Sequence, residues 1–263
     1  MKPYLAVLRS RFLSLLQYRA AALAGVGTQV FFGLVRIMIY DGFYRSSSAQ
    51  QPLTADQVGT YIWLGQALLL LGMLDVDKDI AGMIRSGNVA YEMARPLDLY
   101  NLWLARAVSG RAAPLIMRAM PIFVVAGLFL ELQRPATAGA AALFIISIVI
   151  GLMLAATMVV FMTISLLWTI SGEGIHRLAA PLIFFFSGIV IPLPMFPDWM
   201  QQLIAILPFR GLMDTPSRIY LGVISGLPAV LAILHQIVWI VALVLLGRLV
   251  LARGLRRLVV QGG

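Results

Sequence analysis

Side chains that commonly carry chemistry are scarce in this sequence. It has no cysteine and only two histidines, His176 and His235, which excludes thiol catalysis and cysteine-ligated metals. The two histidines are 59 residues apart, so the sequence has no His-x-x-x-His pair of the kind that a helical zinc site uses. The G-x-x-x-x-G-K-[ST] loop that binds ATP phosphates is also missing. We therefore predict that this chain is not an enzyme and holds no metal or cofactor of its own.

Four other polar residues stand in or beside apolar stretches. Arg36 precedes Asp41 by five residues, and a charge at membrane depth is a functional candidate, although its long side chain favours snorkelling to the outer face. Gln29 and Gln66 are candidates for a cavity lining or for hydrogen bonds between helices, and the sequence does not choose between these roles. Glu173 lies in the short turn SGEGIHR and is either solvated or in contact with a partner.

Composition shows which elements position these residues. Of 263 residues, 61% are apolar and 12% are charged, and the mean hydropathy is +0.93. Soluble domains carry about 25% charged residues, so this chain lacks the polar surface that water requires. That excludes a soluble enzyme, a disordered chain and a disulfide-stapled secreted domain. The net charge of +9 is not gathered in a separate basic domain, so we expect it at the cytoplasmic membrane face and expect no nucleic-acid partner.

Charge-free runs predict the membrane spans, because a span needs about 20 mostly apolar residues. We predict an all-α integral membrane protein, a single transmembrane domain over residues 1–263 with six helices at roughly 20–40, 57–74, 104–130, 138–170, 177–191 and 228–248. The fourth helix would be about 50 Å long at 1.5 Å per residue, so it must tilt, break or protrude. Within it, Gly151 and Ala155 would admit a close neighbouring helix, most simply one of this chain.

Basic residues set the predicted orientation. With the N-terminus inside, 15 of the 20 Lys and Arg residues lie inside and 4 outside, with Arg36 within the first span. This bias predicts that both termini are cytoplasmic. We expect the protein in the cytoplasmic membrane of a bacterium. Residues 1–19 precede the first span and contain an apolar stripe typical of an interfacial helix. The stripe comprises Leu5, Leu8, Phe12 and Leu15. The alternative is a simple continuation of the first span.

The inner segment 75–101 is the most charged part of the chain. Asp79 is the expected cap of a short helix in which Ile80, Met83 and Ile84 share a face, and Gly87 is expected to end it. Asp98 is the expected cap of the third span. The apolar face of the short helix needs a cover, which is either the bilayer surface or a partner protein. Acidic residues outnumber basic ones around it, which favours a protein over an anionic membrane.

The outer segment 192–222 is apolar but broken by proline. Five of the 13 prolines fall in it: Pro192, Pro194, Pro197, Pro208 and Pro216. Proline ends helices, and irregular apolar backbone at membrane depth must be buried in protein or line a wet cavity. We predict a re-entrant pair of short helices, with Trp199 at the membrane interface.

Two stretches carry a resemblance to a known family. They are FFFSGIVIPLPMFPDWMQQLIAILPF at 184–209 and IRSGNVAYEMARPLDLYNLW at 84–103. With the order of the spans, they resemble the membrane subunit of ABC transporters of the type-2 (exporter) family, in the branch with paired permeases and a separate ATPase. The resemblance implies two ATPase subunits that hold ATP and Mg, and a second permease chain, identical or related. It also implies outward movement of a hydrophobic, lipidic or cationic drug-like substrate by alternating access.

The resemblance also implies two sets of site residues. The segment 75–101 corresponds to the coupling loop, whose ATPase contacts would be Asp79, Ile80, Met83, Ile84, Arg85, Ser86, Gly87, Asn88, Glu92 and Arg95, joined by Glu173. The outer gate would comprise Pro192, Pro194, Phe196, Pro197 and Trp199.

Two rival classes need no ATPase. A secondary transporter would show inverted repeats or a row of buried acids, and we find no convincing internal repeat. A membrane enzyme acting on lipids would need His, Asp or Glu clustered at the end of a span, and the sequence shows no such cluster.

Overall fold

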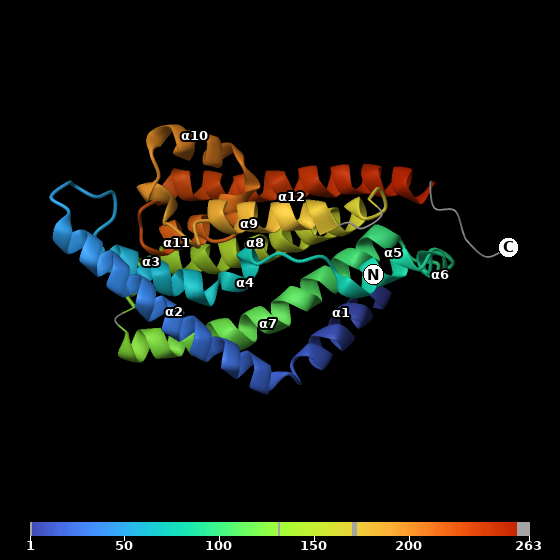
Figure 1. Cartoon of the computed structure of the whole chain (residues 1–263), viewed down its shortest axis with the longest axis horizontal. Helices are drawn as coiled ribbons and strands as arrows, with labels where there is room; N and C mark the ends of the chain where they lie inside the picture. The colour runs from blue at the N-terminus through green and yellow to red at the C-terminus, as the bar shows by residue number, and fades with distance from the viewer. Residues whose placement is uncertain (1, 131, 170–172, 257–263) are drawn as a thin grey trace.

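Four long helices form the body of the protein. The computed structural model describes residues 2–130, 132–169 and 173–256, and within these ranges it contains helices and no strands. Four helices are long and apolar enough to cross a membrane, and they run through the length of the molecule (Figure 1). They are α2 (Arg19–Ser46), α7 (Leu99–Phe129), α8 (Ala138–Ser165) and α12 (Gly226–Leu255). The predicted all-helical membrane fold is therefore confirmed.

The other two predicted spans are shorter than expected. Residues 57–74 fall on α3 (Ala55–Ala67) and α4 (Leu69–Gly72), which are separated by a break at Leu68. The predicted span 177–191 falls on α9 (Glu173–Phe186), which ends five residues early. The predicted fourth helix also stops early, since α8 ends at Ser165. The remaining helices are α1 (Lys2–Leu15), α5 (Lys78–Arg85), α6 (Val89–Met93), η1 (Leu193–Met195), α10 (Asp198–Ile206), η2 (Pro208–Gly211) and α11 (Asp214–Tyr220).

Helix α8 is the centre of the core. Its neighbours are α7, α11 and α12, and it is the most buried of the four long helices. Gly151 lets another backbone approach, because a Cβ there would lie 3.1 Å from the carbonyl oxygen of Gly211. Ala155, one turn later, is also buried. This pair of small residues therefore packs within the chain, as its spacing predicted.

Helix α1 forms an arm that lies along α7 (Figure 1). Its inner face carries Tyr4 and Val7, which pack on the core, and the Tyr4 hydroxyl accepts a hydrogen bond of 2.8 Å from the Asp98 backbone N–H. Leu5 and Leu13 remain exposed. The helix is thus separate from α2, as predicted, but Leu5 does not share the face that packs on α7.

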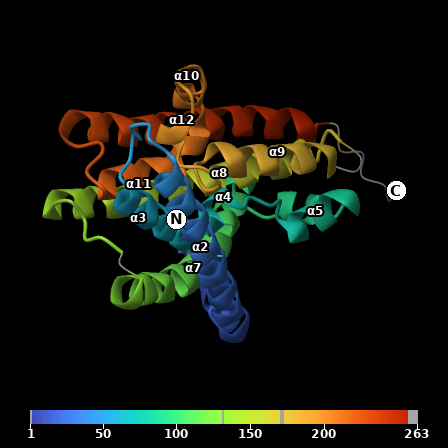
Figure 2. The ribbon, with the colours of Figure 1, turned by 60° about the vertical axis from the view of Figure 1, so that its left-hand side comes forward.

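The two ends of the bundle differ. One end, called here the terminal end, holds α5, α6, the start of α1 and the last turns of α12 (Figure 1). The opposite end holds α11, the start of α3 and the link between α2 and α3, and α10 projects beside α12 (Figures 1 and 2). The predicted inner and outer segments therefore lie at different ends of the molecule.

Candidate functional site

The segment between α4 and α7 forms a small helical platform at the terminal end. We use "platform" for α5 and α6 with the linker 73–77 that precedes them. The carboxylate of Asp77 accepts hydrogen bonds from the backbone N–H groups of Asp79 (3.0 Å) and Ile80 (3.2 Å), so α5 begins two residues earlier than predicted, with Asp77 and not Asp79 as its cap. Gly87 follows the helix with φ of +75°, which confirms the predicted stop.

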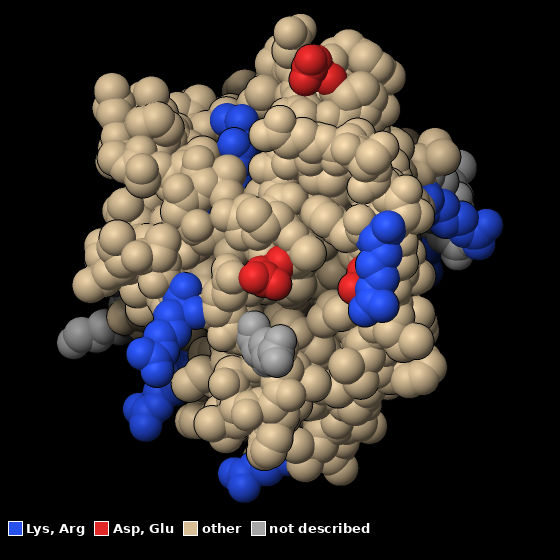
Figure 3. All heavy atoms as spheres, turned by 90° about the vertical axis from the view of Figure 1, so that its left-hand side faces the viewer, with Lys and Arg blue, Asp and Glu red and all other residues tan. Residues whose placement is uncertain are grey.

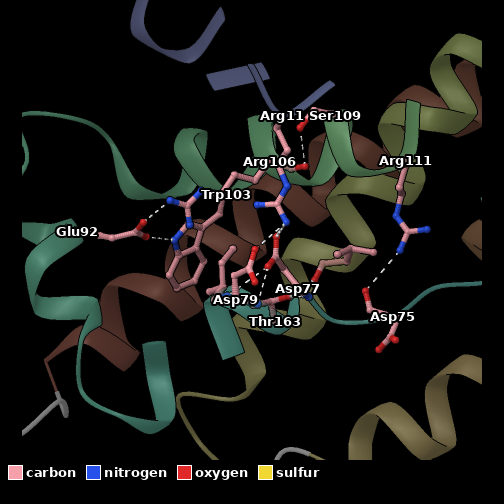
Figure 4. A network of polar contacts seen from close by, with 12 residues as sticks. Arg11, Asp75, Asp77, Asp79, Glu92, Trp103, Arg106, Ser109, Arg111 and Thr163 are labelled. Carbon is pink, nitrogen blue, oxygen red and sulfur yellow. Dashed lines mark hydrogen bonds and ion pairs between the residues drawn. The ribbon is translucent and has the colours of Figure 1, made fainter. Parts of the chain in front are cut away.

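Asp77 also ties the platform to two other helices. Arg11 of α1 forms ion pairs with the carboxylates of Asp77 (3.3 Å) and Asp79 (3.1 Å). The backbone N–H of Asp77 donates to the hydroxyl of Thr163 near the C-terminal end of α8, at 3.3 Å. Figure 4 shows these contacts converging on the start of α5. The start of α5 is therefore bonded directly to α1 and α8.

Glu92 anchors α6 on α7. Its side chain is 4% exposed and accepts a hydrogen bond of 2.9 Å from the indole N–H of Trp103. The second carboxylate oxygen pairs with the guanidinium of Arg106 at 2.5 Å (Figure 4). A buried carboxylate needs such partners to stay charged. Glu92 was predicted as a contact with a partner, but its buried position gives it the role of support beneath the platform.

Arg111 holds the linker that leads to α5. Its guanidinium donates to the backbone carbonyl oxygens of Leu70 and Met73, both at 3.2 Å, and of Asp75 at 3.4 Å. These carbonyls lie in and just after α4, where a helix end leaves acceptors unpaired and favours a cation. The sequence analysis assigned no role to Arg111. The sequence feature that could have indicated a role is the position of this arginine within the apolar run of α7.

A cavity of about 720 Å³ adjoins these contacts between α1 and α7. Its polar lining comprises Arg11, Asp75, Asp77, Lys78, Asp79, Arg106, Arg111 and Arg118. Charges are costly in hydrocarbon, so such a lining is suited to the membrane–water boundary.

The apolar face of α5 points into the protein and not toward solvent. Ile80 is 1% exposed, and Met83 and Ile84 pack partly buried against the main core. The large apolar side chains that the platform exposes come instead from α6, where Tyr91 is 76% and Met93 48% exposed, and from the linker, where Met73 is 52% exposed. The polar positions beside them that were predicted as contacts are exposed, apart from the half-buried Gly87: Asp79, Arg85, Ser86, Asn88 and Arg95. The platform thus presents an aromatic ring and a thioether within a charged rim, a composition typical of protein-binding surfaces.

The turn SGEGIHR was predicted to bring Glu173 to the partner-binding surface. Glu173 begins α9, but its side chain and that of His176 lie outside the described residues. Arg248 of α12 does reach the site, since it pairs with Asp98 at 3.3 Å. Asp98 caps α7, as predicted, by accepting from the Asn101 N–H at 2.8 Å.

The predicted outer gate divides into a buried part and an exposed part. Phe196 is 8% exposed and packs in a small cluster with Leu193 and Ile204. The amide of Gln201 donates to the carbonyl oxygens of Pro194 (3.1 Å) and Phe196 (2.7 Å), which closes the segment on itself. Trp199, by contrast, is 65% exposed. The segment is therefore an ordered cap with one projecting aromatic ring.

The remaining polar candidates form contacts between helices. The amide of Gln29 donates to the backbone oxygen of Gln66 at 2.9 Å, and both residues are buried. Arg36 donates to the carbonyl oxygen of Val190, so its side chain reaches across to the segment after α9. His235 lies against the carbonyl oxygen of Ile206, 3.3 Å from its Nε2. These side chains therefore form hydrogen bonds between segments. The sequence had not decided between this role and a cavity lining for Gln29 and Gln66.

The chain was compared with known proteins. Residues 30–262 match a family model described as ABC-2 family transporter protein. No curated protein and no solved structure matches the chain.

Proposed function

The chain belongs to the ABC-2 family of transporter proteins, and we propose that its platform is the surface on which a partner ATPase docks and drives export. Membership makes the chain a permease subunit of an ABC transporter, a multi-pass membrane component that is not itself catalytic.

The observation that carries the proposal is the way in which the platform is fixed. Arg11, Glu92 and Arg111 tie it to α1, α7 and the end of α4, and Thr163 ties it to α8. A surface that transmits a partner's movement must be bonded to the elements that move, because a loosely held loop would absorb the displacement. Tyr91 and Met93 then provide the exposed apolar anchors that a partner pocket can bury.

The distribution of charge supports the predicted orientation. The terminal end carries several arginines, among them Arg85 of α5, Arg106 of α7 and Arg253 of α12. We place this end in the cytoplasm of a bacterium, with both termini inside. The proposed complex has two ATPase subunits, which hold ATP and Mg, and two permease chains, identical or related. In this arrangement the four long helices cross the membrane, α3 with α4 forms a fifth crossing, and α9 forms a sixth.

The proposed transport step is outward movement by alternating access, with a hydrophobic, lipidic or cationic drug-like substrate. The proline-rich segment after α9 is the proposed re-entrant gate at the outer end. Its own small core, centred on Phe196, supports movement as one body. The exposed ring of Trp199 lies where it would meet lipid or substrate.

A direct test uses the surface residues of α6. Tyr91→Ala should weaken binding of the ATPase that co-purifies with the tagged chain by about 30-fold, the equivalent of roughly 2 kcal/mol for a buried aromatic anchor. The matched control is Tyr18→Ala, which removes a similarly exposed tyrosine between α1 and α2. Affinity and stimulated ATP hydrolysis are measured in reconstituted membranes. Absence of any ABC ATPase from the purified complex, or equal affinity for both variants, would contradict the proposal.

A further inference from the structure

A second polar cluster lies at the opposite end of the bundle, far from the platform. It contains Arg210 of η2, Asp214 and Arg218 of α11, and Tyr61 of α3. Asp214 is 1% exposed and accepts a hydrogen bond of 2.9 Å from the Tyr61 hydroxyl. Its other carboxylate oxygen lies 3.7 Å from Nη1 of Arg218. One carboxylate, already engaged by Tyr61, thus faces two arginines.

The cluster has more donors than acceptors. The contact between Arg218 and Asp214 is longer than an ordinary hydrogen bond, and among the described residues Arg210 has no hydrogen-bonding or ion-pair partner. The Nε atoms of both arginines are buried and have no hydrogen-bond partner in the described structure. Buried donors without an acceptor are destabilising. The excess positive charge and the unused donors both indicate a missing anion.

The space for that anion is present. A cavity of about 300 Å³ is lined on one side by Arg210, Arg218, Asp214 and Thr215. Its other side is the apolar start of α12, formed by Pro228, Leu231 and Ala232 with Ile224 before it. Figure 3 shows this face of the molecule, on which separate basic and acidic side chains are scattered among uncharged ones.

The apolar wall continues beyond the cavity. Leu227, Val230, Leu231 and Leu234 of α12 are all exposed and form a surface that suits a hydrocarbon chain. The site therefore combines a positive pocket with an apolar track. A ligand that matches both parts has an anionic head and an apolar tail.

We propose that Arg210 and Arg218 bind the phosphate group of an anionic phospholipid, whose acyl chain lies along α12. The planar guanidinium matches the oxygen geometry of phosphate and donates two hydrogen bonds at once. In the proposed orientation this lipid belongs to the outer leaflet. The site does not involve the platform or an ATPase, so it stands or falls separately from the proposed transport function.

The test measures binding of dihexanoyl-phosphatidylglycerol and of inorganic phosphate to the purified full chain in a non-ionic detergent, by native mass spectrometry and titration. Arg210→Gln is the main variant, because this side chain has no identified protein partner whose loss would disturb the fold. It should weaken phosphatidylglycerol binding at least tenfold. The matched control is Arg45→Gln, which removes an exposed arginine paired with Asp41 at 2.9 Å and should leave binding unchanged.

A second variant guards against misfolding. Asp214→Asn combined with Arg218→Gln removes both charges of the buried pair, so no lone buried charge remains, and it should also weaken lipid binding. Phosphatidylglycerol binding far stronger than phosphate binding assigns the lipid as the ligand, whereas equal, arginine-dependent binding of both assigns free phosphate to the same site. If both variants bind phosphatidylglycerol as the unaltered chain does, the phosphate site is refuted.

Discussion

The buried contacts of Glu92 with Arg106 and Trp103 hold α6 on α7. Glu92→Ala would leave the guanidinium of Arg106 and the indole N–H of Trp103 without their shared acceptor. Arg106 is only 16% exposed on its side chain, and removing one partner of a buried ion pair costs about 3–5 kcal/mol. For a domain of this size, a loss of that order lowers the unfolding temperature by on the order of 10 °C. We expect this shift in a thermal unfolding experiment on the purified chain.

Two controls isolate the cause. Asp41→Ala breaks an ion pair of similar length, 2.9 Å, in which both side chains are well exposed, and it should cost less than about 1 kcal/mol. Glu92→Gln combined with Arg106→Gln removes both charges and keeps two amides in place, so it should recover most of the lost stability. The ATP hydrolysis of the proposed partner ATPase, measured in the complex, should fall with Glu92→Ala and return in the double variant.

Two results would contradict this role of Glu92. If Glu92→Ala unfolds at the temperature of the unaltered chain, the buried pair does not hold α6 on α7. If the double variant is as unstable as Glu92→Ala, lost packing and not an unpaired charge explains the effect.

The remaining predictions concern the linker, the topology and the outer segment. Arg111→Gln should lower the free energy of unfolding by about 1.5–3 kcal/mol, because charge-assisted hydrogen bonds to the carbonyl oxygens at the end of α4 are lost. It should also reduce the ATP hydrolysis of the bound ATPase, while the ATPase still binds. Unchanged ATP hydrolysis in reconstituted membranes would show that Arg111 has no part in coupling. Single cysteines in this cysteine-free chain should react with a membrane-impermeant maleimide from outside at Ser48→Cys, and only after permeabilisation at Ser86→Cys; labelling of position 86 in intact cells would reverse the topology. Trp199→Ala should reduce transport without a change in unfolding temperature, since the ring is exposed, whereas Phe196→Ala should also destabilise the chain by about 3–5 kcal/mol; normal transport in both variants would make the segment a passive cover.

The sequence by itself determined the features that depend on local pattern. Charge-free apolar runs of about 20 residues specified an all-helical membrane protein, because a run of that length satisfies its backbone hydrogen bonds in lipid when it is helical. Local capping chemistry located the start of α7 at Asp98 and the end of α5 before Gly87. The cap of α5 was misplaced by two residues, because Asp77 and Asp79 both satisfy the capping pattern and only the backbone conformation distinguishes them.

The tertiary structure decided which face of each helix is buried and which distant residues form pairs. Ile80, Met83 and Ile84 share a face in any helix, but their direction depends on where α7 and α8 pass, and the packed chain buries that face. Glu92 and Arg106 are 14 residues apart, and Arg111 bonds a backbone about 40 residues earlier. Tyr61 and Asp214 are 153 residues apart. No local pattern encodes such pairs, since each exists only after helices distant in sequence have packed together.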